Sequence, residues 1–175
     1  MISIIYVFWM YIILFAVIGL LRGWAKELLV GFSVIVGLAL NFILHKFVPV
    51  VSSLKEADSS LFWIRSGILV ILVYFGYQTV ISVARLQAGG RRERLQDSMF
   101  GFFLGGINGY LIVGTLWYYL HAASYPGLAI QTPTDPTLTA AINNLINIMP
   151  PRILGEPWIY FAVIVVLIFI LVVYV

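Results

Sequence analysis

Five long apolar runs constrain this sequence more than any other feature. They cover residues 2–21, 28–44, 61–84, 98–120 and 158–175. A helix needs about 20 mainly apolar residues to cross the hydrocarbon core of a bilayer. Hydrophobic residues make up 62% of the 175-residue chain and charged residues 10%, whereas soluble domains are roughly half apolar and a quarter charged. The sequence therefore predicts an all-α, five-span membrane protein and excludes a soluble enzyme, a nucleic-acid binder and a disordered linker.

The polar segments between the runs predict the organisation of the chain. We expect a four-span bundle over residues 1–121, an outer loop over 122–157 and a fifth span over 158–175. Within the loop, Asp135 is a plausible N-cap and Pro136 suits the first helical position. An amphipathic helix over about 136–149 is predicted, lying flat on the outer surface or capping the bundle. Its predicted apolar face consists of Leu138, Ala141, Ile142, Leu145, Ile148 and Met149.

The basic residues predict the orientation of the spans. With the N-terminus outside, six basic residues fall on the inner side: Arg22, Lys26, Arg85, Arg91, Arg92 and Arg94. Four fall outside: Lys46, Lys55, Arg65 and Arg152. Inner segments of membrane proteins carry the excess of Lys and Arg. We therefore expect the N-terminus outside and the C-terminus inside.

Glycines at helical spacing form the strongest local pattern. Gly101, Gly105 and Gly109 lie on one face of the fourth predicted span, and Gly19 and Gly23 repeat the spacing on the first. Such ridges let another helix backbone approach closely. The partner is either a helix of this chain, which we favour, or a helix of another protein.

Three amides lie within the predicted spans: Asn41, Gln78 and Asn108. They are expected to clamp neighbouring helices through hydrogen bonds. The alternative is a polar pathway for an ion or solute. Conducting pathways usually contain ionisable residues deep in the membrane, and none is expected inside these spans, which favours the clamp.

Charged segments between the spans are expected at the inner surface. One elbow holds Arg22, Lys26 and Glu27, and the other holds Arg91, Arg92, Arg94 and Asp97. The expected role of Arg91, Arg92 and Arg94 is to set topology and contact anionic lipid. For this elbow, docking of a soluble partner or the edge of a larger complex is the alternative.

Cofactor and enzyme signals are weak in this chain. His45 and His121, at two span ends, are candidate haem or pigment ligands, but interfacial hydrogen bonding is the favoured interpretation. The sequence has no cysteine and no HExxH, GxSxG, P-loop or dinucleotide-binding motif. No enzyme activity, metal or cofactor is predicted; bound lipid is expected, and pigment or haem is not.

Two segments resemble the colicin V production protein family of bacterial inner-membrane proteins. The first is Arg22-Gly23-Trp24-Ala25-Lys26-Glu27; the second is Asp97 followed by Gly101, Gly105 and Gly109. The resemblance covers residues 1–121 and leaves out the fifth span. It implies a link to toxin production or export, or to envelope maintenance, in the bacterial inner membrane. We also expect Asp97 to form an ion pair with Arg22 or Arg94.

The leading functional hypothesis is a scaffold or accessory subunit. It would pack through its glycine ridges against other transmembrane subunits of a larger complex, for which a respiratory or photosynthetic assembly is one candidate. The expected partners are membrane lipids and those subunits, with no nucleic acid and no evident small-molecule substrate. The alternatives are a small transport or export component and an envelope-maintenance factor.

Overall fold

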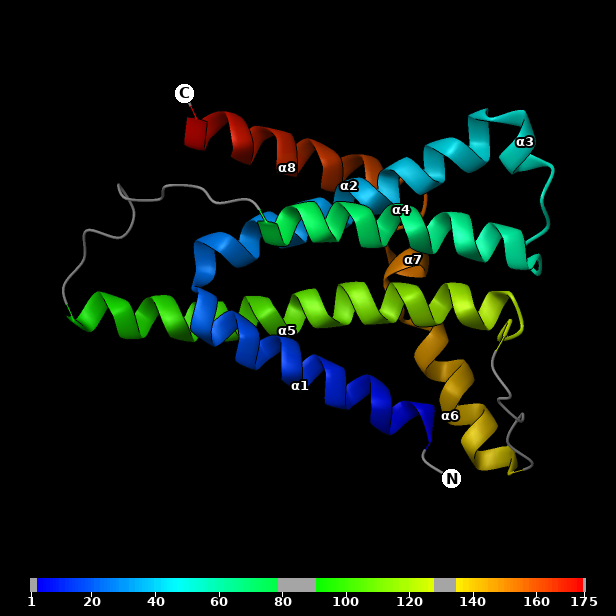
Figure 1. Cartoon of the computed structure of the whole chain (residues 1–175), viewed down its shortest axis with the longest axis horizontal. Helices are drawn as coiled ribbons and strands as arrows, with labels where there is room; N and C mark the ends of the chain where they lie inside the picture. Colours follow the sequence, from blue (N-terminus) through cyan, green and yellow to red (C-terminus); the bar gives the residue numbers. More distant parts are fainter. Residues whose placement is uncertain (1–2, 79–90, 128–134, 175) are drawn as a thin grey trace. The chain divides into compact units, whose positions relative to one another are not determined.

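The computed structural model describes residues 3–78, 91–127 and 135–174, and every regular element in these ranges is a helix (Figure 1). The all-α prediction is therefore confirmed. The long helices are α1 (Ile4–Arg22), α2 (Trp24–Phe47), α4 (Ser59–Gln78), α5 (Arg91–Ala122), α6 (Pro136–Asn147) and α8 (Trp158–Tyr174). The short ones are α3 (Pro49–Ser52) and α7 (Pro150–Ile153).

In the part of the chain that the structure describes, four helices are long and apolar enough to cross a membrane. They are α1, α2, α4 and the part of α5 from Leu95 to Ala122. The fifth predicted span corresponds to α8, which is apolar but has only 17 residues, so five spans are not confirmed. Residues 79–84 of the third predicted span lie outside the described residues.

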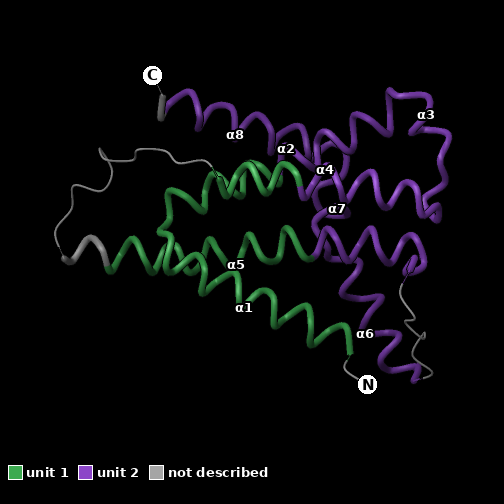
Figure 2. Tube along the Cα trace, viewed as in Figure 1, with its two compact units in different colours: residues 1–34, 71–113 green, residues 35–70, 114–175 purple. Residues whose placement is uncertain are grey.

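The chain forms two compact units, which Figure 2 distinguishes by colour. Unit 1 comprises Met1–Val34 and Ile71–Val113, and unit 2 comprises Ile35–Val70 and Gly114–Val175. Helices α2, α4 and α5 each contribute one part to unit 1 and another to unit 2. The core of unit 1 includes Phe8, Ala16, Val30, Val34 and Ile112. The core of unit 2 includes Leu38, Leu61, Leu69, Trp117, Met149, Ile159 and Val166. The division of the chain expected from the sequence, at residues 121 and 157, stays a prediction.

The elbow predicted after the first span is a single residue long. Gly23 has a φ of 84° and a ψ of 161°, a conformation that residues other than glycine rarely adopt. Helix α1 ends before Gly23 and α2 begins directly after it, so Lys26 and Glu27 are helical rather than part of a loop. Glu27 thereby enters the first turn of a membrane-spanning helix.

Helix α6 confirms the amphipathic helix expected in the outer loop. Asp135 caps it by accepting a hydrogen bond from the Thr137 N–H at 2.8 Å, and Pro136 occupies its first turn. Its 12 residues span about 18 Å, too short to cross a bilayer core of about 30 Å. The predicted apolar face is wrong in one respect: Ile148 follows the helix and is 53% exposed, whereas Ile146 is buried. The expected position of α6 on the outer surface stays a prediction.

The cap of α6 is expected to weaken in acid. The Thr137 hydroxyl and N–H both donate to Asp135 and lower the pKa of its carboxyl group. The cap therefore stabilises the helix fully above about pH 4, the ordinary aspartate value, and less as the pH falls through the lowered pKa. The Thr137 amide chemical shift should follow this titration. Asp135→Asn should abolish the pH dependence, and an unchanged titration in that variant would contradict the assignment.

Candidate functional site

The glycine ridge of α5 lies against α1 within unit 1. A Cβ atom added to Gly19 would lie 2.8 Å from the Cα of Gly105, and one added to Gly101 would lie 3.0 Å from the Cα of Gly23. A Cβ atom on Gly109 would lie 2.8 Å from that of Phe15. Real Cβ atoms do not tolerate the shorter of these contacts, so the two helices meet at backbone distance. The partner of this ridge is a helix of the same chain.

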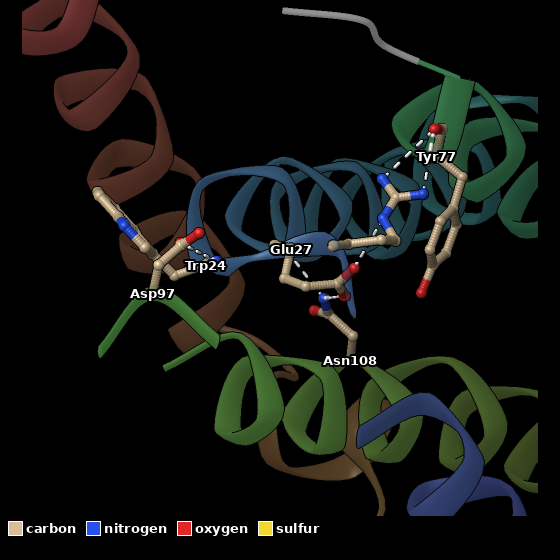
Figure 3. Close-up of polar contacts among 6 residues, drawn as sticks. Trp24, Glu27, Tyr77, Asp97 and Asn108 are labelled. Atoms are coloured by element: carbon tan, nitrogen blue, oxygen red, sulfur yellow. Dashed lines mark hydrogen bonds and ion pairs between the residues drawn. The ribbon is translucent and has the colours of Figure 1, made fainter. Parts of the chain in front are cut away.

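Asp97, the first residue of the glycine pattern, caps helix α2 from α5. Its Oδ1 accepts a hydrogen bond from the Trp24 N–H at 3.0 Å (Figure 3). Its carboxylate also occupies the space beside Gly23, where a Cβ atom would lie 2.6 Å from Oδ2. A carboxylate at this place satisfies a free N–H and complements the positive end of the helix dipole. The Gly23 conformation and the aspartate thus position the start of α2.

Among the described residues, Asp97 does not form the expected ion pair with Arg22. Arg22 pairs with Glu27 instead, with 3.0 Å between Nε and Oε1. Asp97 is engaged by the Trp24 N–H. The alternative partner, Arg94, has a side chain outside the described part of the chain.

Glu27 lies at the centre of the candidate site. Its side chain is 0% exposed, whereas that of Arg22 is 24% exposed. The Nδ2 of Asn108 donates to Oε2 of Glu27 and to its main-chain oxygen, both at 2.8 Å (Figure 3). The expectation that the spans contain no buried charge is therefore wrong. The polar sequence after the first span predicts a longer elbow at the surface that includes Glu27. Because the break between α1 and α2 is Gly23 alone, Glu27 is helical and buried.

Arg22 has a second set of partners on α4. Its Nη1 and Nη2 donate to the main-chain oxygen of Tyr77 at 3.3 and 3.4 Å, and its guanidinium carbon lies 4.4 Å from the centre of the Tyr77 ring. Within the described part of the chain, the buried Tyr77 hydroxyl has no hydrogen-bond partner. Figure 3 shows this hydroxyl at the end of the ring nearer Asn108, with the carbonyl at the other end. Arg22 therefore links α1 to α4 independently of Glu27.

The three predicted amides have different surroundings. Asn108 belongs to the Glu27 site. Asn41, in unit 2, is buried and donates to the main-chain oxygen of Arg65 at 3.0 Å. Gln78 is exposed at the end of α4. Asn41 and Asn108 thus both join two helices, as a clamp would.

Both histidines have protein partners. His45 Nε2 lies 3.7 Å from Oε1 of Glu56, which also forms a two-pronged pair with Arg65 at 2.8 and 3.1 Å. His121 Nδ1 lies 3.0 Å from the Tyr125 hydroxyl. Among the described residues, no group of three His, Asp or Glu side chains is arranged to hold a metal ion. Lys26 is partly exposed, and the side chains of Arg91 and Arg92 lie outside the described set.

Sequence reasoning named every member of the Glu27 site except Tyr77, but it did not bring them together. One available signal is spacing: Asn108 lies nearly one helical turn after Gly105 on α5. Asn108 therefore shares a face with a glycine of the close contact. The aromatic Tyr77 carries no such signal, because Arg22 is bound by its main-chain carbonyl.

Comparison with known proteins identifies a family. The family model described as colicin V production protein matches residues 5–134, a segment that includes α1 from its second residue, α2, α4, α5 and every residue of the Glu27 site. No curated protein and no solved structure matches the chain significantly.

Proposed function

Since the chain belongs to the colicin V production protein family, we propose that this membrane protein is a small transport component acting in the export step of toxin production. The polar site formed by Arg22, Glu27 and Asn108 is the part of the protein that takes part in transport. We place it in the bacterial inner membrane with its N-terminus outside, in line with the distribution of its basic residues. The family is not a known enzyme family, and the proposed function requires no catalytic step.

The single observation that carries this proposal is the buried Glu27 carboxylate. Removing charged groups from water costs several kcal/mol per ion, of the order of what an ion pair returns. Ionisable side chains inside membrane helices are accordingly rare, and they typically mark ion or solute pathways. A purely structural contact between α1, α2 and α5 would not require one, because the glycine ridge already joins α1 to α5.

The scaffold hypothesis has less support than the transport hypothesis. It depended on glycine ridges that are free to accept a helix of another protein. Gly19, Gly101 and Gly105 pack against one another, and Gly109 packs against Ile12 and Phe15. A partner subunit would have to bind elsewhere on the protein.

The transport proposal predicts that Glu27→Gln abolishes toxin export while the protein still folds. Gln keeps the shape and can still bond to Asn108, but it removes the charge. The measurement is the ratio of a peptide toxin in the medium to that inside producing cells, with membrane levels of each variant checked in parallel. Export should fall at least about tenfold, equivalent to about 1.4 kcal/mol of activation free energy.

The matched control is Glu56→Gln. Glu56 also pairs with an arginine, at 2.8 Å, but its side chain is 56% exposed. Export should be unchanged in this variant. Normal export by a well-folded Glu27→Gln variant would refute the proposed function.

A further inference from the structure

The Glu27 carboxylate has one oxygen that is bonded and one that is not. Oε2 accepts a hydrogen bond from Asn108 at 2.8 Å. Oε1 lies 3.0 Å from the Arg22 Nε, yet neither atom has a hydrogen bond of acceptable geometry. A buried oxygen acceptor without a donor is uncommon and calls for an explanation.

The surroundings of Glu27 suit both an ionised and a neutral carboxyl group. Arg22 from α1 supports the ionised form, but it also has the Tyr77 carbonyl and ring as partners. Arg22 therefore stays bound to α4 if Glu27 becomes neutral. The Tyr77 hydroxyl is buried, has no hydrogen-bond partner among residues 3–78, 91–127 and 135–174, and lies close enough to Glu27 to interact electrostatically. A hydroxyl can accept a hydrogen bond from a neutral carboxyl group or donate one to a carboxylate.

From this geometry we infer that Glu27 is a reversible proton-binding site and that the proton is the ion coupled to transport. A hydronium ion transfers its proton to Oε1 of Glu27, leaving water, and the new O–H bond points to the Tyr77 hydroxyl oxygen. Oε2 keeps its bond from Asn108. The Arg22–Glu27 ion pair is lost, while the bonds from Arg22 to Tyr77 remain. Proton binding thus uncouples α1 from α2 at Glu27 without releasing α1 from α4.

The charged and titratable groups near Glu27 come from three other helices. Among the described residues they are Arg22 from α1, Tyr77 from α4 and Asp97 from α5, and Asp97 is held by the Trp24 N–H. Arg22 is the partly exposed member. Its Nε, which lies beside Oε1, is nevertheless buried, so solvent reaches only the rest of the Arg22 side chain.

Proton binding is measured by infrared difference spectroscopy of the purified protein in lipid vesicles. The carboxyl C=O band of a neutral glutamic acid should be absent at high pH and should appear as the pH is lowered. Labelling of glutamate with ¹³C should move this band, and Glu27→Gln should remove it. The label identifies a glutamate in the unmodified protein even if that variant does not fold.

Tyr77→Phe tests whether the new carboxyl O–H bond points to the Tyr77 hydroxyl. It removes only the hydroxyl, so the C=O band should move because the carboxyl O–H loses its acceptor. An unmoved band would overturn the assignment to Oε1. Absence of a titrating band, or a band that is present at every pH, would overturn the proton site itself.

Coupling of the proton to transport rests on the proposed function, whereas proton binding at Glu27 does not. The spectroscopy requires no transport, and the export assay requires no proton binding. If export depends on Glu27 but no titrating band appears, the transport function stands and proton binding at Glu27 is refuted. A titrating band with normal export by Glu27→Gln would do the reverse.

Discussion

Gly105→Ala is expected to destabilise the protein, whereas Gly106→Ala, one position along the same helix, is expected to leave it unchanged or more stable. A Cβ atom on Gly105 would lie 2.9 Å from the Cα of Gly19, and the carbonyl of Phe15 is nearer still. These are main-chain atoms, so α1 must move away. On Gly106 the nearest atom would be the Ala16 Cβ at 3.6 Å, an ordinary contact.

The pair of variants separates packing from helix propensity. Alanine favours a helix over glycine by about 1 kcal/mol at either position, and overpacking costs about 1–3 kcal/mol at Gly105 alone. The free energy of unfolding in mixed detergent micelles should therefore differ between the variants by about 1–3 kcal/mol. Equal stabilities would contradict the close contact of α1 and α5.

Arg22→Met is expected to destabilise the protein because it leaves Glu27 buried without its cation. Breaking a buried ion pair on one side costs about 3–5 kcal/mol, and the lower end applies because Arg22 is partly exposed. The measurement is again the free energy of unfolding in detergent. The double variant Arg22→Met, Glu27→Gln should recover much of the loss, since no unpaired charge remains.

Lys46→Met provides the control for this second prediction. Lys46 pairs with Glu156 at 2.6 Å, but both side chains are nearly half exposed, so each is solvated when the other is removed. Its loss should change stability far less than that of Arg22. If the double variant were no more stable than Arg22→Met, the cost would come from the Tyr77 contacts of Arg22 rather than from the buried charge.

Features set by neighbouring residues were predictable. The Asp135 cap and the start of α6 follow from side chains within three positions of each other, and the apolar runs identify the long helices because length and hydropathy suffice. The glycine spacing predicted a close helix contact. Its partner was left open, because the periodicity of one helix says which residues share a face and nothing about what covers that face.

The burial of Glu27 could not be predicted from the residues next to it in the sequence. A charged hexapeptide after an apolar run is typical of a surface elbow, and Glu27 was placed there. Its burial depends on Gly23 turning the chain in one residue, on Asp97 capping α2 from α5, and on Asn108 arriving 81 positions along the sequence. These contacts are non-local, so the sequence pattern of α2 does not contain them.

The membrane setting, the positions of the long helices, the cap of α6 and the family are all predictable from the order of the residues. They follow from composition, from spacing within one helix, or from motifs that are read in order along the chain. The packing of α1 against the glycine ridge, and the pairing of Arg22 with Glu27 in place of Asp97, come from the way the helices pack. The physical reason is that burial and pairing of a charge are settled by the helices around it, which lie far away in the sequence.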